Sequence, residues 1–179
     1  MIFQKSVDVE MLKIEPITSK TVAEQVVFIA REIWSDHYAP IIGQEQVDYM
    51  LEKFQSSKAI AQDQSAGFEY FSINIEQKLV GYLSFLVERE NRSVFLSKIY
   101  IHSSARGTGI GAATMQFILA QCSEYGAETL WLTVNKKNDN SIAWYLKQGF
   151  VIVDTTVTDI GGGFVMDDYK MEKVFDFKS

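Results

Sequence analysis

The sequence has 179 residues, of which 47% are hydrophobic, and it carries a formal net charge of −6 with a pI near 5.0. A chain of this size and composition can bury one good core, so we expect a single domain spanning residues 1–179. The acidic balance argues against a nucleic-acid partner, because binding to phosphates needs a basic surface. No apolar stretch approaches the length of a membrane span, so no membrane partner is expected.

The cysteine and histidine residues are too few and too scattered to form a disulfide or a metal site. The single cysteine, Cys122, cannot form an internal disulfide, and the N-terminal segment lacks the apolar core of a signal peptide, so we expect a cytoplasmic protein. His37, His102 and Cys122 do not have zinc-ligand spacing, so no metal is predicted. Cys122 lies mid-helix among apolar residues and is interpreted as a core residue, not a nucleophile.

The N-terminal half of the chain predicts two amphipathic helices and then strands. Thr21 and Glu24 form a capping pair that would begin the first helix, and the second helix would run from about Gln44 to Phe54. The strand candidates that follow cover residues 68–75, 79–87 and 94–102. The first two of these strands would form a hairpin.

The C-terminal half alternates between helices and strands. The pattern predicts a helix over 110–125, a strand over 129–134, a short helix ending at Gln148, and strands over 150–157 and 164–174. An arm containing three consecutive glycines would join the last two strands. Helices placed among hairpins indicate a mixed, mostly antiparallel α/β fold.

A glycine-rich turn separates the strand ending near His102 from the helix that follows it. The turn consists of Arg106, Gly107, Thr108, Gly109, Ile110 and Gly111. Glycines let the backbone approach a ligand closely, and a helix start offers N–H groups and partial positive charge. This arrangement predicts a ligand that carries phosphates.

The residues of the turn discriminate between phosphate ligands. A nucleoside triphosphate is disfavoured, because the lysine and hydroxyl residue that end a P-loop are replaced by Ile110, Gly111 and Ala112. The spacing Gly107-x-Gly109-x-x-Ala112 does satisfy a dinucleotide fingerprint. However, the next strand ends in Asn135 without the acidic residue that would hold a ribose. A dinucleotide-binding oxidoreductase therefore stays open as the less favoured alternative.

A second motif follows the turn and has Asn138, Ser141, Tyr145, Gly149 and Phe150 at fixed spacing. Together with Arg106, Gly109 and Gly111, this segment resembles the GNAT superfamily of acyl-CoA-dependent N-acetyltransferases. The resemblance is clearest from about Leu79 to Phe150. It implies a mixed, mostly antiparallel central sheet flanked by helices in a three-layer sandwich.

The resemblance also implies acetyl-CoA as co-substrate and assigns residues to it. Backbone amides from Arg106 to Ala112 would hold the pyrophosphate, and the strand backbone at Tyr100 and Ile101 would pair with the pantetheine arm. Asn138 and Ser141 would contact the coenzyme, although Ser141 also suits the start of a helix. Tyr145 would be the general acid that protonates the departing thiolate, since a phenol with a pKa of about 10 keeps its proton at neutral pH.

The general base is not identified by the sequence. The strand before the turn offers no carboxylate where many family members carry one, which leaves Glu88, His102, an ordered water or an amine that arrives neutral. Trp34, His37 and Tyr38 are expected just after the first helix, where the family usually builds its acceptor pocket. An aromatic wall there would hold a cationic amine by cation–π contact, or it would simply cover the core.

The acceptor and the assembly state are left open. Part of the chain resembles acetyltransferases of polyamines and other small amines, and an acidic rim would suit a polycation; its candidates are Asp154, Asp159, Asp167 and Asp168. A peptide amine is the other acceptor class. A GNAT module that binds acyl-CoA without turnover, as a sensor, is a further alternative. An exposed strand edge would also allow a homodimer.

Overall fold

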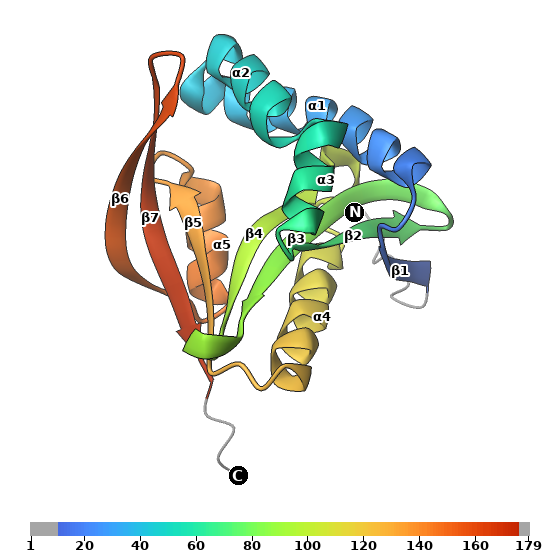
Figure 1. Cartoon of the computed structure of the whole chain (residues 1–179), viewed down its shortest axis with the longest axis vertical. Coiled ribbons are helices and arrows are strands. Elements are labelled where there is room, and N and C mark those ends of the chain that lie inside the picture. The colour runs from blue at the N-terminus through green and yellow to red at the C-terminus, as the bar shows by residue number, and fades with distance from the viewer. Residues whose placement is uncertain (1–10, 176–179) are drawn as a thin grey trace, which may run out of the picture. The chain divides into compact units, whose positions relative to one another are not determined.

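The computed structural model describes residues 11–175 (Figure 1). These residues divide into two compact units. The first unit contains residues 11–85 and Lys98–Gln121, and the second contains Leu86–Ser97 and residues 122–175. Because the prediction of a single domain over 1–179 concerns the whole chain, it stays a prediction. The N-terminal segment on which the expected cytoplasmic location partly rests lies outside the described residues.

The first unit combines helices with an antiparallel part of the sheet. Its elements are β1 (Leu12–Pro16), α1 (Lys20–Ile42), α2 (Gln44–Phe54), α3 (Ser57–Ser65), β2 (Glu69–Ile75), most of β3 (Lys78–Glu88), the end of β4 (Ser93–Ile101) and most of α4 (Ile110–Glu124). The strand order is β1-β2-β3-β4. A two-residue turn joins β2 to β3, and both of its residues, Glu76 and Gln77, have positive φ, as hairpin turns of this length require. The predicted hairpin is therefore confirmed.

The two faces of this sheet are covered by different helices. Tyr70 pairs with Ser84 and Tyr82 with Ser72, so these side chains share the face whose hydroxyl groups reach α3 and the end of α2. Phe71 points to the opposite face and contacts Phe117 of α4 at 5.2 Å between ring centroids. Strand alternation thus places helices on both faces of the sheet within this unit.

Helix α1 begins earlier and ends later than the sequence indicates. Its N-cap is Ser19, whose hydroxyl accepts from the Val22 N–H at 3.3 Å, so the predicted capping pair of Thr21 and Glu24 was wrong. The helix continues through Pro40 and ends at Ile42, and its C-cap is Gly43, which has a φ of 85°. A proline near a helix end interrupts only one hydrogen bond of the last turns, which is why the aromatic residues expected after the helix lie inside it.

Two elements were not predicted. Strand β1 has only five residues and alternates poorly between buried and exposed positions. Helix α3 has nine residues and buries only Ala59 and Ile60, so its apolar periodicity is weak. Its N-cap hydroxyl, from Ser56, accepts from the Ala59 N–H at 3.2 Å. No helix within residues 11–175 is long and apolar enough to cross a membrane.

The second unit is a sheet with one helix. It contains the start of β4, β5 (Thr129–Asn135), α5 (Asp139–Lys147), β6 (Val151–Gly161) and β7 (Phe164–Val174), with strand order β4-β5-β7-β6. The β4–β5 pair is parallel and the other two pairs are antiparallel. Along β5, buried residues alternate with half-buried ones. The predicted mixed, mostly antiparallel α/β fold is confirmed.

Candidate functional site

The glycine-rich turn in the first unit leads directly into α4. Gly107 has a φ of 73° and Gly109 a φ of 90°, values that side chains other than glycine rarely adopt. A Cβ added at either glycine would meet no atom within 4 Å, so the space in front of this backbone is open. The first turn of α4 carries no acidic side chain. Because the first N–H groups of a helix lack partners within the helix, the turn is suited to an anion.

Side chains of the turn brace its backbone. Arg106 donates from Nε to the carbonyl of Ile101 at 2.8 Å, and Thr108 donates from its hydroxyl to the carbonyl of Ala105 at 2.6 Å. Ile110, the first residue of α4, is buried, whereas Ala112, two residues further on, is exposed. Arg106 is itself exposed, so it contributes charge at the surface as well as holding the end of β4.

The end of β4 lies close to β3. A Cβ on Gly81 would lie 2.4 Å from the carbonyl oxygen of Tyr100, so only glycine fits there without displacing the β4 backbone. The next residue but one, His102, donates its N–H to the carbonyl of Val80 at 2.8 Å. The backbone at Tyr100 and Ile101 is therefore positioned by contacts on the β3 side.

Aromatic rings from α1, β3 and β4 meet in the first unit. The ring of Tyr100 lies 5.3 Å from Trp34, 6.2 Å from Tyr38 and 5.2 Å from Tyr82, centroid to centroid. His37 packs edge-on against Tyr38 at 4.8 Å. Trp34 and Tyr82 are buried, whereas His37, Tyr38 and Tyr100 are half-buried. Trp34, His37 and Tyr38, which were predicted to form the acceptor wall, therefore lie close together. Trp34 is the buried member of the three.

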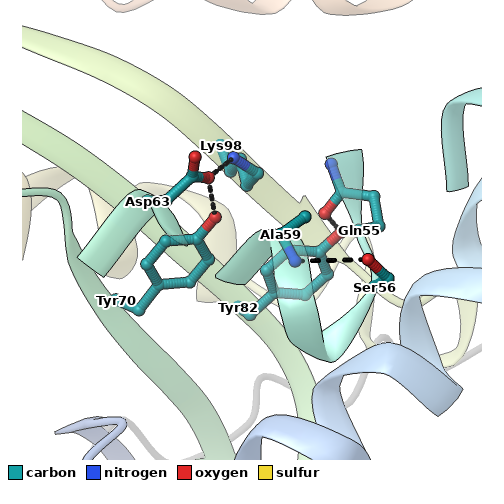
Figure 2. Close-up of polar contacts among 7 residues, drawn as sticks. All are labelled: Gln55, Ser56, Ala59, Asp63, Tyr70, Tyr82 and Lys98. Atoms are coloured by element: carbon teal, nitrogen blue, oxygen red, sulfur yellow. Dashed lines mark hydrogen bonds and ion pairs between the residues drawn. The ribbon is translucent and has the colours of Figure 1, made fainter. Parts of the chain in front are cut away.

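A network of charged and hydroxyl groups adjoins these rings (Figure 2). The carboxylate of Asp63 accepts from the Tyr70 hydroxyl at 2.5 Å and from the Lys98 ammonium at 3.0 Å. The Tyr82 hydroxyl donates to Gln55 Oε1 at 2.9 Å. Burial lowers the pKa of Lys98, although the Asp63 charge opposes the effect. Burial also raises the pKa of Tyr70 well above its usual range, and Asp63 adds to that rise.

The second motif lies in the second unit. Asn138 is the N-cap of α5, and its Oδ1 accepts from the Ser141 N–H at 3.3 Å. The amide nitrogen of Asn138 is buried and has no hydrogen-bond partner among the described residues 11–175, which fits a ligand that supplies an acceptor. Ser141 thus takes part in helix capping. Tyr145 is 9% exposed and packs edge-on against Trp144 and Phe150 at 5.2 and 5.6 Å.

Both candidate bases already take part in structural contacts. Oε2 of Glu88 accepts from the Ser93 hydroxyl at 2.6 Å and from the Trp131 indole N–H at 2.8 Å. Nδ1 of His102 accepts from the Ser104 N–H at 3.2 Å, and its Nε2 lies 3.7 Å from Glu32. These contacts give both side chains a structural role, so their positions can be explained without a catalytic one.

A carboxylate that the sequence analysis placed in an exposed rim is buried instead. Asp168 on β7 is 4% exposed, and burial raises its pKa to about 6. The charge of Asp167 adds to this rise, while Thr133 and Lys136 oppose it. The placement of Asp168 in an acidic rim was therefore wrong. No sequence signal marks it, since alternation along β7 does not distinguish a functional aspartate from a surface one.

Within residues 11–175, no group of three or more histidine, cysteine, aspartate or glutamate side chains is placed to hold a metal ion. Cys122 is fully buried, and burial raises the pKa of its thiol to about 12. A thiol in that state is a poor nucleophile, which agrees with its interpretation as a core residue.

Comparison with known proteins gives consistent matches. Residues 27–150 match the sequence profile of the acetyltransferase (GNAT) family. An uncharacterized N-acetyltransferase of Mycobacterium bovis is 39% identical over 84 residues, which cover 47% of this chain and 53% of that protein. The chain therefore spans about half the length of the curated relatives that it matches.

Solved structures match over nearly the whole chain. PaiA N-acetyltransferase from Thermoplasma acidophilum, in complex with coenzyme A, gives a TM-score of 0.76 at 20% identity, covering 92% of this chain and 99% of that one. Ribosomal-protein-alanine N-acetyltransferase from Brucella melitensis gives a TM-score of 0.64 at 23% identity, covering 91% and 99%. At these identities the likeness establishes the fold.

Proposed function

Because the chain belongs to the GNAT family of acetyltransferases, we propose that it moves an acetyl group from acetyl-CoA to a primary amine by direct attack. The observation that carries this proposal is the open backbone at Gly107 and Gly109, which leads into a helix start without acidic side chains. Such a backbone suits the pyrophosphate of coenzyme A. The coenzyme-bound relative from Thermoplasma acidophilum has the same fold.

The residues proposed for acetyl-CoA are those that the sequence motifs assign. Backbone amides from Arg106 to Ala112 would hold the pyrophosphate, and the backbone of Tyr100 and Ile101 would pair with the pantetheine arm. The buried and unpartnered amide nitrogen of Asn138 supports its role as a donor to the coenzyme. Ser141 has a sufficient structural explanation as part of the α5 cap, so its contribution is the weakest of the set.

In the proposed reaction a neutral amine attacks the thioester carbonyl. The C–N bond forms, the C–S bond breaks, and the sulfur leaves as a thiolate, while the nitrogen, which becomes cationic on attack, gives one proton to solvent and so becomes the neutral amide nitrogen. Tyr145 supplies the proton that the thiolate takes up, which lowers the barrier because a neutral thiol is the better leaving group. Tyr145 regains from solvent the proton that it gives to the thiolate. The Tyr145 hydroxyl belongs to the helix that Asn138 caps, so its position depends on the same motif.

Trp34, His37 and Tyr38 are proposed to line the acceptor side. The rings of His37 and Tyr38 are only half-buried, so a ligand can reach them. Such rings suit an ammonium group or an alkyl amine, since cations are attracted to the faces of aromatic rings. The acidic rim for a polycation receives less support. Asp168 is buried and Asp167 forms an ion pair with Lys136 at 2.5 Å. A small monoamine is therefore favoured over a polyamine.

One observation favours a second candidate function. Glu88 and His102 are both engaged in structural contacts, as expected of a module that binds acyl-CoA without turnover. A dinucleotide-binding oxidoreductase is not supported, because the strand after the turn still ends in Asn135. A homodimer and a cytoplasmic location stay predictions.

Isothermal titration of the purified protein with acetyl-CoA, with NADH as the control ligand, tests the proposal. Saturable binding of acetyl-CoA alone, followed by acetylation of any member of an amine panel, supports the transferase. Binding without turnover on the whole panel identifies the sensor module. Binding of NADH in place of acetyl-CoA would revive the oxidoreductase.

A further inference from the structure

The helix that carries Tyr145 is short and is held at both ends. Helix α5 has nine residues, and isolated helices of this length are marginally stable at best in water. Asn138 caps its N-terminus by accepting from the Ser141 N–H. At the other end the Phe150 N–H donates to the Tyr145 carbonyl at 3.1 Å, a contact typical of helix C-terminal motifs. The position of Tyr145 therefore depends on the contacts at this second end.

A lysine from the sheet contacts the C-terminal end of α5. The Nζ of Lys173 on β7 donates to the carbonyl of Gln148, the C-cap residue, at 2.8 Å. The last carbonyls of a helix lack partners within the helix and carry partial negative charge, so an ammonium group is favourable there. Among residues 11–175, no ion pair includes Lys173. The Gln148 carbonyl is thus the polar partner of this ammonium.

The glycine of the second motif leaves room for this contact. Gly149 has a φ of 87°, and a Cβ added to it would lie 2.7 Å from the Lys173 Nζ. Lys173 is half-buried and lies opposite Leu130 of β5, which is fully buried, and paired residues share a face of the sheet. The lysine therefore reaches the helix end from a fixed position in the sheet, and only glycine at position 149 allows it to do so.

Gln148 connects Lys173 to Tyr145. The Gln148 N–H donates to the carbonyls of Trp144 and Tyr145 at 3.0 Å each. Two residues later, the Phe150 ring packs edge-on against the Tyr145 ring, with 5.6 Å between the ring centroids. A shift of Gln148 would therefore disturb both the backbone of Tyr145 and the ring against which its phenol packs.

We propose that Lys173 is a positioning residue for Tyr145, because its ammonium holds the end of α5 against β7 and so fixes the phenol that protonates the thiolate. This inference rests on the proposed acetyl transfer with Tyr145 as the general acid. Small displacements of a catalytic group lower the rate steeply. Loss of the Lys173 contact should therefore lower kcat. The KM for acetyl-CoA should change little, since the coenzyme is assigned to the glycine-rich turn and to the opposite end of α5.

The test is a double-mutant cycle between Lys173→Met and Tyr145→Phe, measured as kcat and KM with an amine that the wild type acetylates. Methionine keeps an apolar stem but cannot donate to the Gln148 carbonyl. In the wild-type background, Lys173→Met should lower kcat at least about fivefold and leave the KM for acetyl-CoA within about twofold. In the Tyr145→Phe background it should lower kcat by less than about twofold, because the phenol that Lys173 positions is already absent.

Lys147→Met is the matched control, because Lys147 is an exposed cation in the last turn of the same helix. It should keep the wild-type kcat. An equal loss in the Lys147 and Lys173 variants would show that positive charge near the helix end is what matters, and it would overturn the assignment of a specific contact.

Two further results overturn the assignment while leaving the transferase intact. One is an unchanged kcat in Lys173→Met, and the other is the same loss in both backgrounds, which would mean that Lys173 acts on the fold as a whole. If Tyr145→Phe alone has no effect, the role of Tyr145 and this inference fail together. A wild type that acetylates no amine overturns the transferase as well. If Lys173→Met does not fold, Lys173→Gln takes its place in the cycle under the same criteria.

Discussion

The ammonium of Lys98 lies 3.0 Å from Oδ2 of Asp63, so a buried cation on β4 is paired with a part-exposed anion on α3. The same oxygen accepts from Tyr70 of β2 (Figure 2). The strand whose end is proposed to pair with pantetheine is thereby tied to a helix and to a second strand. None of these three residues is marked by the sequence motifs.

Asp63→Asn should destabilise the protein, because it leaves the Lys98 ammonium buried without its anion. Loss of one partner of a buried pair costs about 3–5 kcal/mol, and the partial exposure of Asp63 should bring this to about 2–3 kcal/mol. The pKa of Lys98 should fall further, since Asp63 is what raises it. Urea unfolding measures the loss. The exposed Lys20–Glu24 pair supplies the control, and Glu24→Gln should change stability by less than about 0.5 kcal/mol. Equal effects of both substitutions would contradict the importance of the buried pair.

Gly109→Ala should weaken acetyl-CoA binding at least about tenfold, because a Cβ would enter the space proposed for the pyrophosphate. It should also cost about 1 kcal/mol of stability, since alanine at a φ of 90° is strained. Gly126→Ala is the matched control. Gly126 has a φ of 65° with nothing within 4 Å of a Cβ, and it lies in the turn after α4. Titration calorimetry should find its affinity unchanged; a similar loss in both variants would show that strain alone weakens binding.

Tyr145→Phe should lower turnover at least tenfold, equivalent to about 1.4 kcal/mol of barrier, with little change in acetyl-CoA affinity. The phenylalanine ring preserves the edge-on packing against Trp144 and Phe150. Tyr49→Phe, which removes a hydroxyl that accepts from Lys53 on α2, controls for loss of a phenol elsewhere. Steady-state kinetics with a saturating amine provides the comparison. Unchanged turnover in the Tyr145 variant would remove this residue from the mechanism.

The raised pKa of Asp168 predicts a pH dependence of stability. The folded chain binds this proton more tightly than the unfolded chain, whose aspartate has the ordinary pKa of 3.8. Protonation therefore stabilises the fold fully below about pH 4, and this contribution is lost as the pH rises through about 6. The difference corresponds to about 3 kcal/mol.

Asp168→Asn should accordingly be more stable than wild type at pH 8, by up to about 3 kcal/mol, and equal to it below pH 4. Urea denaturation at the two pH values measures both differences. A variant that is less stable than wild type at pH 8 would show that the carboxylate is stabilised by contacts instead of strained by burial.

The fold was largely predictable because its strongest signals are local. Residues 164–174 form a strand with the predicted bounds, and the glycine turn opens a helix at Ile110 as expected. The errors fall where local signals are weak. Strand β1 and helix α3 owe their structure to contacts with other elements, such as the hydrogen bond from Gln64 on α3 to the Ile17 carbonyl after β1.

The site was only partly predictable. Glycines with positive φ and the Asn138 cap leave sequence signatures, because each depends on a residue type at a fixed spacing. The burial of Asp168 and the pairing of Lys98 with Asp63 depend on residues that are distant in sequence, so no spacing reveals them. The approach of Gly81 to Tyr100 is a contact of the same kind.

Acetyl transfer itself gives the most direct test of the account. The full chain is incubated with acetyl-CoA and a panel of small monoamines, polyamines and peptides, and both the released coenzyme A thiol and the acetylated amine are measured. We predict thiol release that requires the amine and matches the amount of acetylated product, with small monoamines preferred. Saturable acetyl-CoA binding without acetylation of any panel member would contradict the account and leave a binding module.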